Sequence, residues 1–509
     1  MKRGGGPGRH AGSAAARGYA EAVPEQVERE VTHRRGLGTG REIGLATAVF
    51  VLTFGLLMVR LLVPRAIGAA DNGDGKRVLC GLGIQWETPA QDFARTAYTE
   101  PILGCKSDYF LSQIWFLRAA QWVGRIVGTE STVNLVIVGI LSSILVAASV
   151  ALIALGAQFP WRYRLALSAG VLLVLADSAF FGYFSSVLGE GPAFIGITLM
   201  VGGMLLMSRT GWWRYLGMAV TIGGGIIGVN AKVQTLMILP ILLLALVFIR
   251  PDGMKGIARW APVGLVFAAV LNGTLYLQPP LGEETGPGQD TREINMFNTI
   301  FMSIVDGEHD TGADLAALGL PESFGQYAAN GWWHPHPARF DPLYPQYREK
   351  ISRRNVVEYF AEHPDRTVQI LNRAATDLLK ARPEYLASFT REAGYPPLTL
   401  EYRVPVFSGI TAFIAPLGLW VLIPLWLLIA FAAVRAWRSP LRIRQFGVVI
   451  LFLLGIALGQ FPLAALGDGI ENIKHQSVAL FCTLLGLVLS AATLVRNTAD
   501  GGRDEPTVT

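Results

Sequence analysis

Charged residues are scarce in this sequence. Only 16% of its 509 residues are Asp, Glu, Lys or Arg, whereas 51% are hydrophobic. This balance is typical of a protein embedded in a lipid bilayer. The formal net charge of +5 comes from residues that flank the apolar runs, so it gives no reason to expect nucleic-acid binding.

Several common signatures are also missing. The phosphate-binding pattern GxxxxGK[ST] and the zinc-binding pattern HExxH do not occur. No stretch alternates strongly enough between polar and apolar residues to predict a β domain. No repeat of the hydropathy pattern is obvious, which weakens the case for an inverted-repeat transporter.

The sequence does contain long apolar runs. A helix needs roughly 20 residues to cross the hydrocarbon core, and it satisfies its own backbone groups there. We count about ten such runs, at residues 43–63, 132–156, 165–183, 192–208, 214–229, 235–249, 260–278, 406–434, 445–465 and 476–495. We therefore predict an all-α integral membrane protein with about ten transmembrane helices.

The distribution of Lys and Arg predicts the orientation. Positive residues gather before the first run and in alternate short loops, and such segments are expected to be cytoplasmic. They are Arg29, Arg34, Arg35, Arg41, Arg162, Arg164, Arg209, Arg214, Arg250, Lys255, Arg259, Arg435, Arg438, Arg442 and Arg444. The other short loops carry only Lys232 and Lys474. Both termini are thus expected inside.

The two ends of the chain are predicted to be cytoplasmic tails, at residues 1–42 and 496–509. The first tail is rich in Gly, Ala and Arg and has no apolar run, so we expect it to be disordered and not a cleaved signal peptide. The membrane part then comprises residues 43–278 and 406–495.

The first of two external segments covers residues 64–131. It contains Cys80 and Cys105, and an oxidising exterior would permit a disulfide between them; the alternative is two unrelated thiols. The stretch "YFLSQIWFLRAAQWVGRIV" has apolar residues at helical spacing. It predicts a helix that lies on the membrane surface or packs against the other external segment.

The second external segment, residues 279–405, is expected to be mainly helical. Helical periodicity runs from residue 354 to 386, and Pro364 divides it into two short helices. The stretch "GWWHPHPARF" leaves three readings open. Trp332 and Trp333 suit stacking on a sugar, His334 and His336 could bind a metal, or the stretch is a structured loop.

Charged residues also gather at the outer ends of the predicted spans. Asp71 and Asp74 follow the first span in "ADNGDGKRVLCGLG", and the short external turns contain Glu190, Lys232, Asp468, Glu471, Lys474 and His475. For any one of these residues, a solvated helix end is the ordinary explanation. Because carboxylates, lysines and a histidine coincide in one leaflet, we favour a shared site.

Asp177 differs from these residues because it lies inside a predicted span. A carboxylate at that depth is costly, and it usually faces a cavity or a partner. We therefore include Asp177 among the candidate substrate-binding residues.

Carboxylates and cations at an outer surface, where no ATP is available, suit sugar transfer from a lipid-linked donor. The donor is activated by its phosphate ester, so no nucleotide site is needed. An aspartate can act as general base on the acceptor hydroxyl while cations stabilise the departing lipid phosphate.

The order of spans and external segments resembles the GT-C class of glycosyltransferases, which use polyprenyl-phosphate sugars. Four stretches, "DNGDGKRV", "YFSSVLGEGPAF", "NMFNTIFMSIVDGEHDTGADLAALGLPE" and "GDGIENIKHQ", also resemble bacterial glycan-biosynthesis hexose transferases of the WsfD type. The similarity extends over residues 44–495.

The resemblance implies inverting hexose transfer at the outer face of the bacterial plasma membrane, from a polyprenyl-phosphate sugar to a cell-surface glycan or glycolipid. In GT-C enzymes the base is generally an acid of the first external loop, which matches Asp71 or Asp74. The family's acids are commonly adjacent, whereas Asn72 and Gly73 separate them here, so the choice stays open. No cofactor is certain, although a divalent ion held by Asp71, Asp74 and Asp177 is an alternative.

Two other classes of function compete with this interpretation. A transporter or flippase for a lipid-linked precursor would place polar residues near the bilayer centre and on both faces. The Gly-rich "TIGGGIIGVN" suits that reading, but close helix packing explains it better. A receptor or scaffold would leave the external carboxylates replaceable.

Overall fold

The computed structural model describes residues 25–70, 73–84, 92–98, 111–128, 133–249, 254–278, 291–439 and 441–500. The chain forms two compact units, Met1–Leu45 and Ala46–Thr509. Helix α1 (Glu25–Leu62) begins in the first unit and ends in the second. The sheets, the external helices and the charged residues described below belong to the second unit.

The predicted helical membrane architecture is confirmed. Seven of the described helices are long and apolar enough to span a membrane. They are α1, α4 (Leu135–Gly156), α6 (Glu190–Met207), α9 (Trp260–Leu277), α16 (Leu419–Trp437), α17 (Leu441–Gly467) and α19 (Ser477–Asp500). The other predicted runs also form helices, α5 (Trp161–Ala176), α7 (Trp212–Val229) and α8 (Ile238–Phe248), which do not meet these criteria.

The predicted span at 406–434 is not one helix. It divides into α15 (Val406–Ile414), a short 3₁₀ turn and α16, with Gly418 at a φ of +51° between them. Glycine tolerates this left-handed conformation, and the side chain of Asn372 accepts a hydrogen bond from the Leu419 amide at 3.0 Å. The membrane helix therefore begins at Leu419.

Other boundaries differ from the sequence interpretation by part of a helix. Helix α1 begins at Glu25, inside the segment expected to be a disordered tail, and α19 continues to Asp500. The run at 165–183 ends as α5 at Ala176, because Asp177 adopts an extended conformation and η1 (Phe181–Ser185) follows.

Helices α6 and α7 pack with their backbones unusually close. A Cβ atom at Gly196 would lie 2.4 Å from the backbone of Gly228, and one at Gly203 would lie 2.8 Å from the carbonyl oxygen of Gly217. Small residues permit such an approach between membrane helices. Gly224 and Gly228 of "TIGGGIIGVN" thus serve close packing against α6, as we favoured from the sequence.

The described residues of the first external segment, together with the two residues just before α4, form short helices and strands. They are β1 (Ile67–Ala69), α2 (Gly75–Cys80), β2 (Ala97–Tyr98), α3 (Gln113–Ile126) and β3 (Val133–Asn134). Strand β2 pairs with β3, and β1 pairs antiparallel with β4 (Leu386–Phe389) of the second external segment. Helix α3 packs on α4, while its Trp122 and Ile126 are exposed.

The second external segment is mainly helical, as predicted. Its helices are α10 (Thr291–Asn298), the π-helix η4 (Thr299–Ile304), α11 (Thr311–Ala317), α12 (Tyr344–Tyr347), α13 (Arg353–Glu362) and α14 (Pro364–Lys380), with short 3₁₀ turns between them. Pro364 is the first residue of α14 and follows directly on α13, so the predicted division is confirmed.

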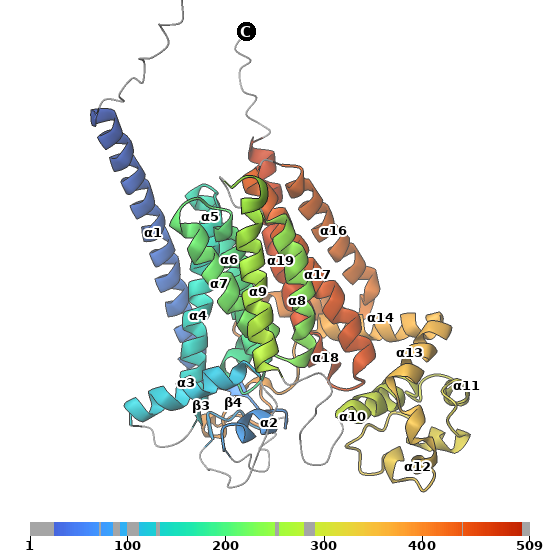
Figure 1. Ribbon diagram of the computed structural model, residues 1–509. Helices are drawn as coiled ribbons and strands as arrows, with labels where there is room; N and C mark the ends of the chain where they lie inside the picture. Colours follow the sequence, from blue (N-terminus) through green and yellow to red (C-terminus); the bar gives the residue numbers. More distant parts are fainter. Residues whose placement is uncertain are drawn as a thin grey trace, which may run out of the picture. The chain divides into compact units, whose positions relative to one another are not determined.

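Helix α14 joins two hydrophobic cores. Ile370 packs in an aromatic core with Phe297 and Tyr359, whereas Ala375 and Leu379 pack in the core of the membrane helices. Figure 1 shows that the external helices, the short strands and α18 (Asn472–His475) lie toward the same end of the helix bundle.

Candidate functional site

Lys474 lies where this end of the bundle meets the first external segment. It belongs to the short helix α18, between α17 and α19, and its side chain is only 1% exposed. The ammonium group donates hydrogen bonds to the carboxylates of Asp74 and Glu471. The Asp74 side chain is 49% exposed. The buried ammonium group of Lys474 is therefore bound to a carboxylate that contacts solvent.

A second ion pair joins Glu190 to Lys232. Glu190 is the first residue of α6, and Lys232 follows the end of α7; their Oε1 and Nζ atoms are 2.5 Å apart. The preceding glycine permits this approach. A Cβ atom at Gly189 would lie 2.4 Å from the carbonyl oxygen of Ala231 and 2.8 Å from Cγ of Lys232.

Asp468 and His475 form a third pair. Nε2 of His475 lies 3.7 Å from Oδ2 of Asp468, and both side chains are 14% exposed. On its other side, Nδ1 of His475 is 3.2 Å from the side-chain nitrogen of Gln234. The turn that carries Asp468 rests on the external helices, since a Cβ atom at Gly469 would lie 2.2 Å from the carbonyl oxygen of Asn298.

We refer to these residues as the charged cluster. Its members are Asp74, Glu190, Lys232, Asp468, Glu471, Lys474 and His475, all of them candidates from the sequence. Electrostatic contacts connect the pairs: Lys232 and His475 act on Asp74, and Glu190 acts on Lys474. The fold therefore brings together seven of the predicted residues from four separate parts of the chain.

The acids of the charged cluster differ in proton affinity. Burial raises the pKa of Asp74, but Lys474 and Lys232 outweigh that effect and lower it to about 2. Burial dominates at Asp468 and raises its pKa to about 6. Burial, together with the two lysines, also lowers the pKa of His475 well below its usual value, so the imidazole is neutral at pH 7.

Two tyrosines belong to the same site, although sequence reasoning missed them. The Tyr385 hydroxyl donates a hydrogen bond to Glu471 at 3.3 Å, and Tyr183 is fully buried near Glu190. Tyr385 directly precedes β4, whose pairing with β1 places it here. Tyr183 lies in "FGYFSS", seven residues before Glu190, which was the available signal.

Asp177 lies elsewhere and has other partners. Its carboxylate accepts hydrogen bonds from the backbone amides of Ala179, Phe407 and Ser408, at 2.7–3.3 Å. Phe407 and Ser408 are in the first turn of α15, where an acidic side chain satisfies otherwise unpaired amides. Hydrogen bonds from the amides at the start of α15 thus offset the free-energy cost of burying this carboxylate. Among the described residues, no member of the charged cluster forms a hydrogen bond with Asp177.

Two other predictions fall partly outside the described residues. Asp71 and Cys105 both lie there, so the choice between Asp71 and Asp74 is not made by the geometry. Cys80 ends α2, is buried and is disulfide-bonded. Its pairing with Cys105 stays a prediction.

The aromatic and histidine stretch is mainly structural. Trp332 is 9% exposed and packs against Phe297, with the Arg339 guanidinium 4.7 Å from its ring centroid. His334 accepts a hydrogen bond from the His336 amide at 3.1 Å, which shapes the turn. Trp333 remains exposed.

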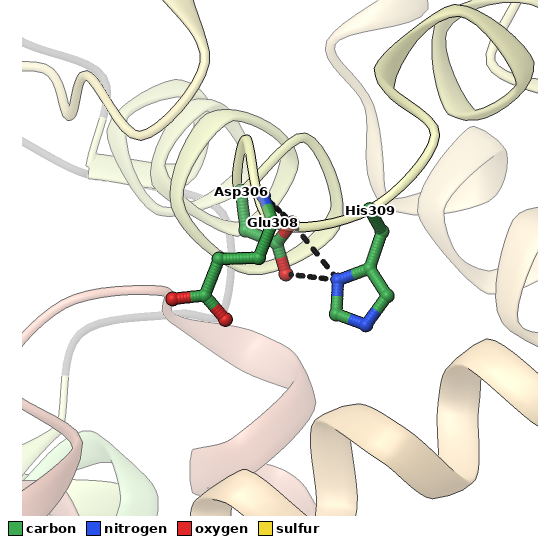
Figure 2. Close-up of side chains that lie close together, drawn as sticks. All are labelled: Asp306, Glu308 and His309. Carbon is green, nitrogen blue, oxygen red and sulfur yellow. Dashed lines mark hydrogen bonds and ion pairs between the residues drawn. The ribbon is translucent and has the colours of Figure 1, made fainter.

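Asp306, Glu308 and His309 are the one group of metal-binding residue types that converges within the described ranges. Figure 2 shows His309 bonded to the carboxylate of Asp306. Asp306 also binds Arg373, at 3.0 Å, and accepts the Glu308 amide, at 3.0 Å. The guanidinium of Arg373 already balances the charge of Asp306. We therefore interpret these contacts as stabilising the turn and not as a metal site.

Comparison with known proteins places the chain in a family. The model of the family described as YfdI N-terminal transmembrane domain matches residues 30–496. No significant match was found among curated proteins or among solved structures. The family match is consistent with the GT-C resemblance and does not single out the WsfD type. The chain belongs to the YfdI transmembrane-domain family, a family of GT-C-like membrane glycosyltransferases.

Proposed function

We propose that this protein transfers a sugar from a polyprenyl-phosphate donor to a cell-surface glycan or glycolipid. The observation that carries the proposal is the charged cluster, in which acids and lysines from distant parts of the chain meet at one end of the membrane helices. Both external segments reach this end, through Asp74 and through Tyr385. A donor anchored in the bilayer can therefore meet the sugar part of an acceptor there.

The chemistry needs a proton acceptor and a partner for the leaving phosphate. The acceptor hydroxyl attacks the anomeric carbon, the bond to the lipid phosphate breaks, and one displacement inverts that carbon. The charged cluster has four carboxylates that can take the hydroxyl proton. Its two lysines are paired with acids, so a phosphate would exchange places with a carboxylate at Lys232 or Lys474.

The positions of the arginines support an outward-facing site. Arg214 and Arg444 lie in the first turns of α7 and α17, and the opposite ends of these helices lead to Lys232 and Asp468 of the charged cluster. Positive residues mark cytoplasmic ends. We accordingly place the cluster on the extracytoplasmic face of the plasma membrane.

A transporter or flippase is less well supported. Such a protein would hold its substrate near the bilayer centre, between broken helices. In the described residues the charged cluster lies at helix ends, Gly217, Gly224 and Gly228 of α7 pack against α6, and the buried Asp177 caps a helix.

The test is a strain from which the gene is deleted, complemented with the wild-type full chain. We expect the deletion strain to lose one sugar from its surface glycan and to accumulate a polyprenyl-phosphate monosaccharide, both restored by complementation. A complete glycan that instead remains inside the cell would support a transporter and contradict the proposal.

A further inference from the structure

Two large aromatic side chains of the second external segment are exposed. Trp333 is 61% exposed and Phe340 is 63% exposed, and both belong to the stretch "GWWHPHPARF". The neighbouring Trp332 is instead buried in the aromatic core of this segment. A single exposed apolar side chain is ordinary on a protein surface. What distinguishes Trp333 is how firmly its backbone is held, which groups surround it and where it lies.

The backbone next to Trp333 is fixed on both sides of the preceding residue. The Trp332 amide donates a hydrogen bond to Oδ1 of Asn298 at 2.8 Å, and the Trp332 carbonyl oxygen accepts one from Nε of Arg339 at 3.1 Å. The guanidinium carbon of Arg339 lies 4.7 Å from the ring centroid of Trp332 and 4.2 Å from that of Phe340. An aromatic ring presented by such a fixed backbone loses little conformational freedom when it binds a partner.

The residues that follow Trp333 are polar and exposed, among them His334 and His336. A flat aromatic ring beside hydrogen-bonding groups is complementary to a sugar, which has an apolar C–H face and a rim of hydroxyl groups. The exposed face of α3 is different, since its Trp122 is accompanied by Ile126. That composition is typical of a helix at a membrane surface. We therefore favour a carbohydrate over lipid as the partner of Trp333.

Asn298 connects this loop to the charged cluster. Its side chain accepts the Trp332 amide, and its backbone carbonyl packs directly on Gly469, the residue after Asp468. The bond lengths along this route place the Cα atom of Trp333 within about 20 Å of that of Asp468. A chain of a few sugar units can span this separation.

We propose that Trp333 stacks on a sugar of the acceptor glycan, a few units away from the sugar that receives the transferred residue. This inference rests on the proposed glycosyl transfer and adds an acceptor subsite to it. The acceptor is then an oligosaccharide or polysaccharide and not a lipid that carries one sugar. Because Trp333 lies away from the reacting atoms, it contributes to the affinity for the acceptor and not to the displacement at the anomeric carbon.

The experiment measures transfer in membranes of the deletion strain that contain the full chain. The donors are labelled polyprenyl-phosphate glucose, galactose and mannose, supplied in turn. The acceptor is the surface glycan of the deletion strain, released from its anchor and supplied at graded concentrations. Trp333→Ala should raise the acceptor KM roughly 3-fold to 10-fold and leave kcat and the donor KM within about twofold.

Two further variants and a binding measurement define the effect. Trp333→Phe keeps an aromatic ring and should recover part of the lost affinity. Trp122→Ala removes a similarly exposed Trp from α3 and should leave the acceptor KM unchanged. Surface plasmon resonance with the purified full chain in detergent should show that the same released glycan binds Trp333→Ala more weakly, by the factor seen in KM.

An acceptor KM that Trp333→Ala leaves unchanged would overturn the inference. A fall in kcat at a constant acceptor KM would also overturn it, because it would indicate that Trp333 contacts another protein or the lipid surface. The same holds if Trp122→Ala raises the acceptor KM as much as Trp333→Ala does. If the wild-type chain transfers none of the three sugars and the deletion strain makes a normal glycan, the proposed function itself fails.

Discussion

At the residue scale, the charged cluster depends on a buried ammonium group. Lys474 is 1% exposed and touches two carboxylates that retain 49% and 30% exposure. Burial alone would lower the pKa of a lysine, but the attraction of Asp74 and Glu471 outweighs burial and raises it. The residue therefore stays charged without being accessible to bulk water.

Lys474→Met should destabilise the protein by about 1–3 kcal/mol. The substitution leaves two carboxylates without their donor, although their exposure allows water to compensate in part. Thermal unfolding of the purified protein in detergent measures the effect. Lys380→Met is the matched control, because Lys380 is 52% exposed and its pair with Asp377 should contribute less than about 1 kcal/mol. Equal losses for both variants would contradict the assigned role.

Gly189→Ala tests the Glu190 and Lys232 pair by sterics alone. Its φ of −71° suits any residue, so the added Cβ acts only by pushing the Ala231 carbonyl and the Lys232 side chain away. We expect transfer to fall roughly 10-fold to 100-fold. Gly223→Ala in α7, where a Cβ meets nothing within 4 Å, should leave transfer unchanged. Normal activity of Gly189→Ala would show that this pair is not needed.

At the scale of the elements, Asp177 connects the end of α5 to the start of α15. A buried acid that accepts two amides of a first helical turn resembles a helix cap in its energetics. The same region contains a buried ion pair between Arg60 of α1 and Glu401. Glu401 lies shortly before the start of α15 at Val406. These contacts fix where the chain re-enters the membrane.

Asp177→Ala should cost about 1–2 kcal/mol of stability. Asp177→Asn keeps one carbonyl acceptor and should cost less. Both should retain the transfer rate per folded molecule, measured in membranes after quantifying the protein by gel filtration in detergent. If Asp177→Asn were as stable as wild type yet inactive, Asp177 would return to the list of substrate-binding residues.

At the scale of the whole molecule, the alternation of charge predicts the topology. Reporter fusions after residues 131, 190, 300 and 470 should report an external location, and fusions after residues 160, 211, 255 and 440 a cytoplasmic one. In the structure, residues 190 and 470 lie at the same end of the bundle, beside the charged cluster. A cytoplasmic signal at residue 470 would place the site on the wrong side for a surface acceptor.

Much of this architecture could be predicted because hydropathy and charge act locally. The apolar runs are mainly helical because a bilayer leaves no other partner for their backbone groups. Pro364 separates two helices because its ring prevents continuation. The charged residues near the helix ends could be collected from the sequence for the same reason: adjacent spans alternate in direction, so every second turn lies on one face.

The tertiary structure alone decided which of these residues act together and how. Asp74 and Lys474 are 400 positions apart, and nothing in either segment announces the other. Asp177 and Asp468 are both acids at helix ends. The carboxylate of Asp177 accepts hydrogen bonds from backbone amides, whereas that of Asp468 faces His475. Helix boundaries and charge patterns are local properties of the chain. The partner and the proton affinity of a buried acid depend on contacts that form only when distant segments pack together.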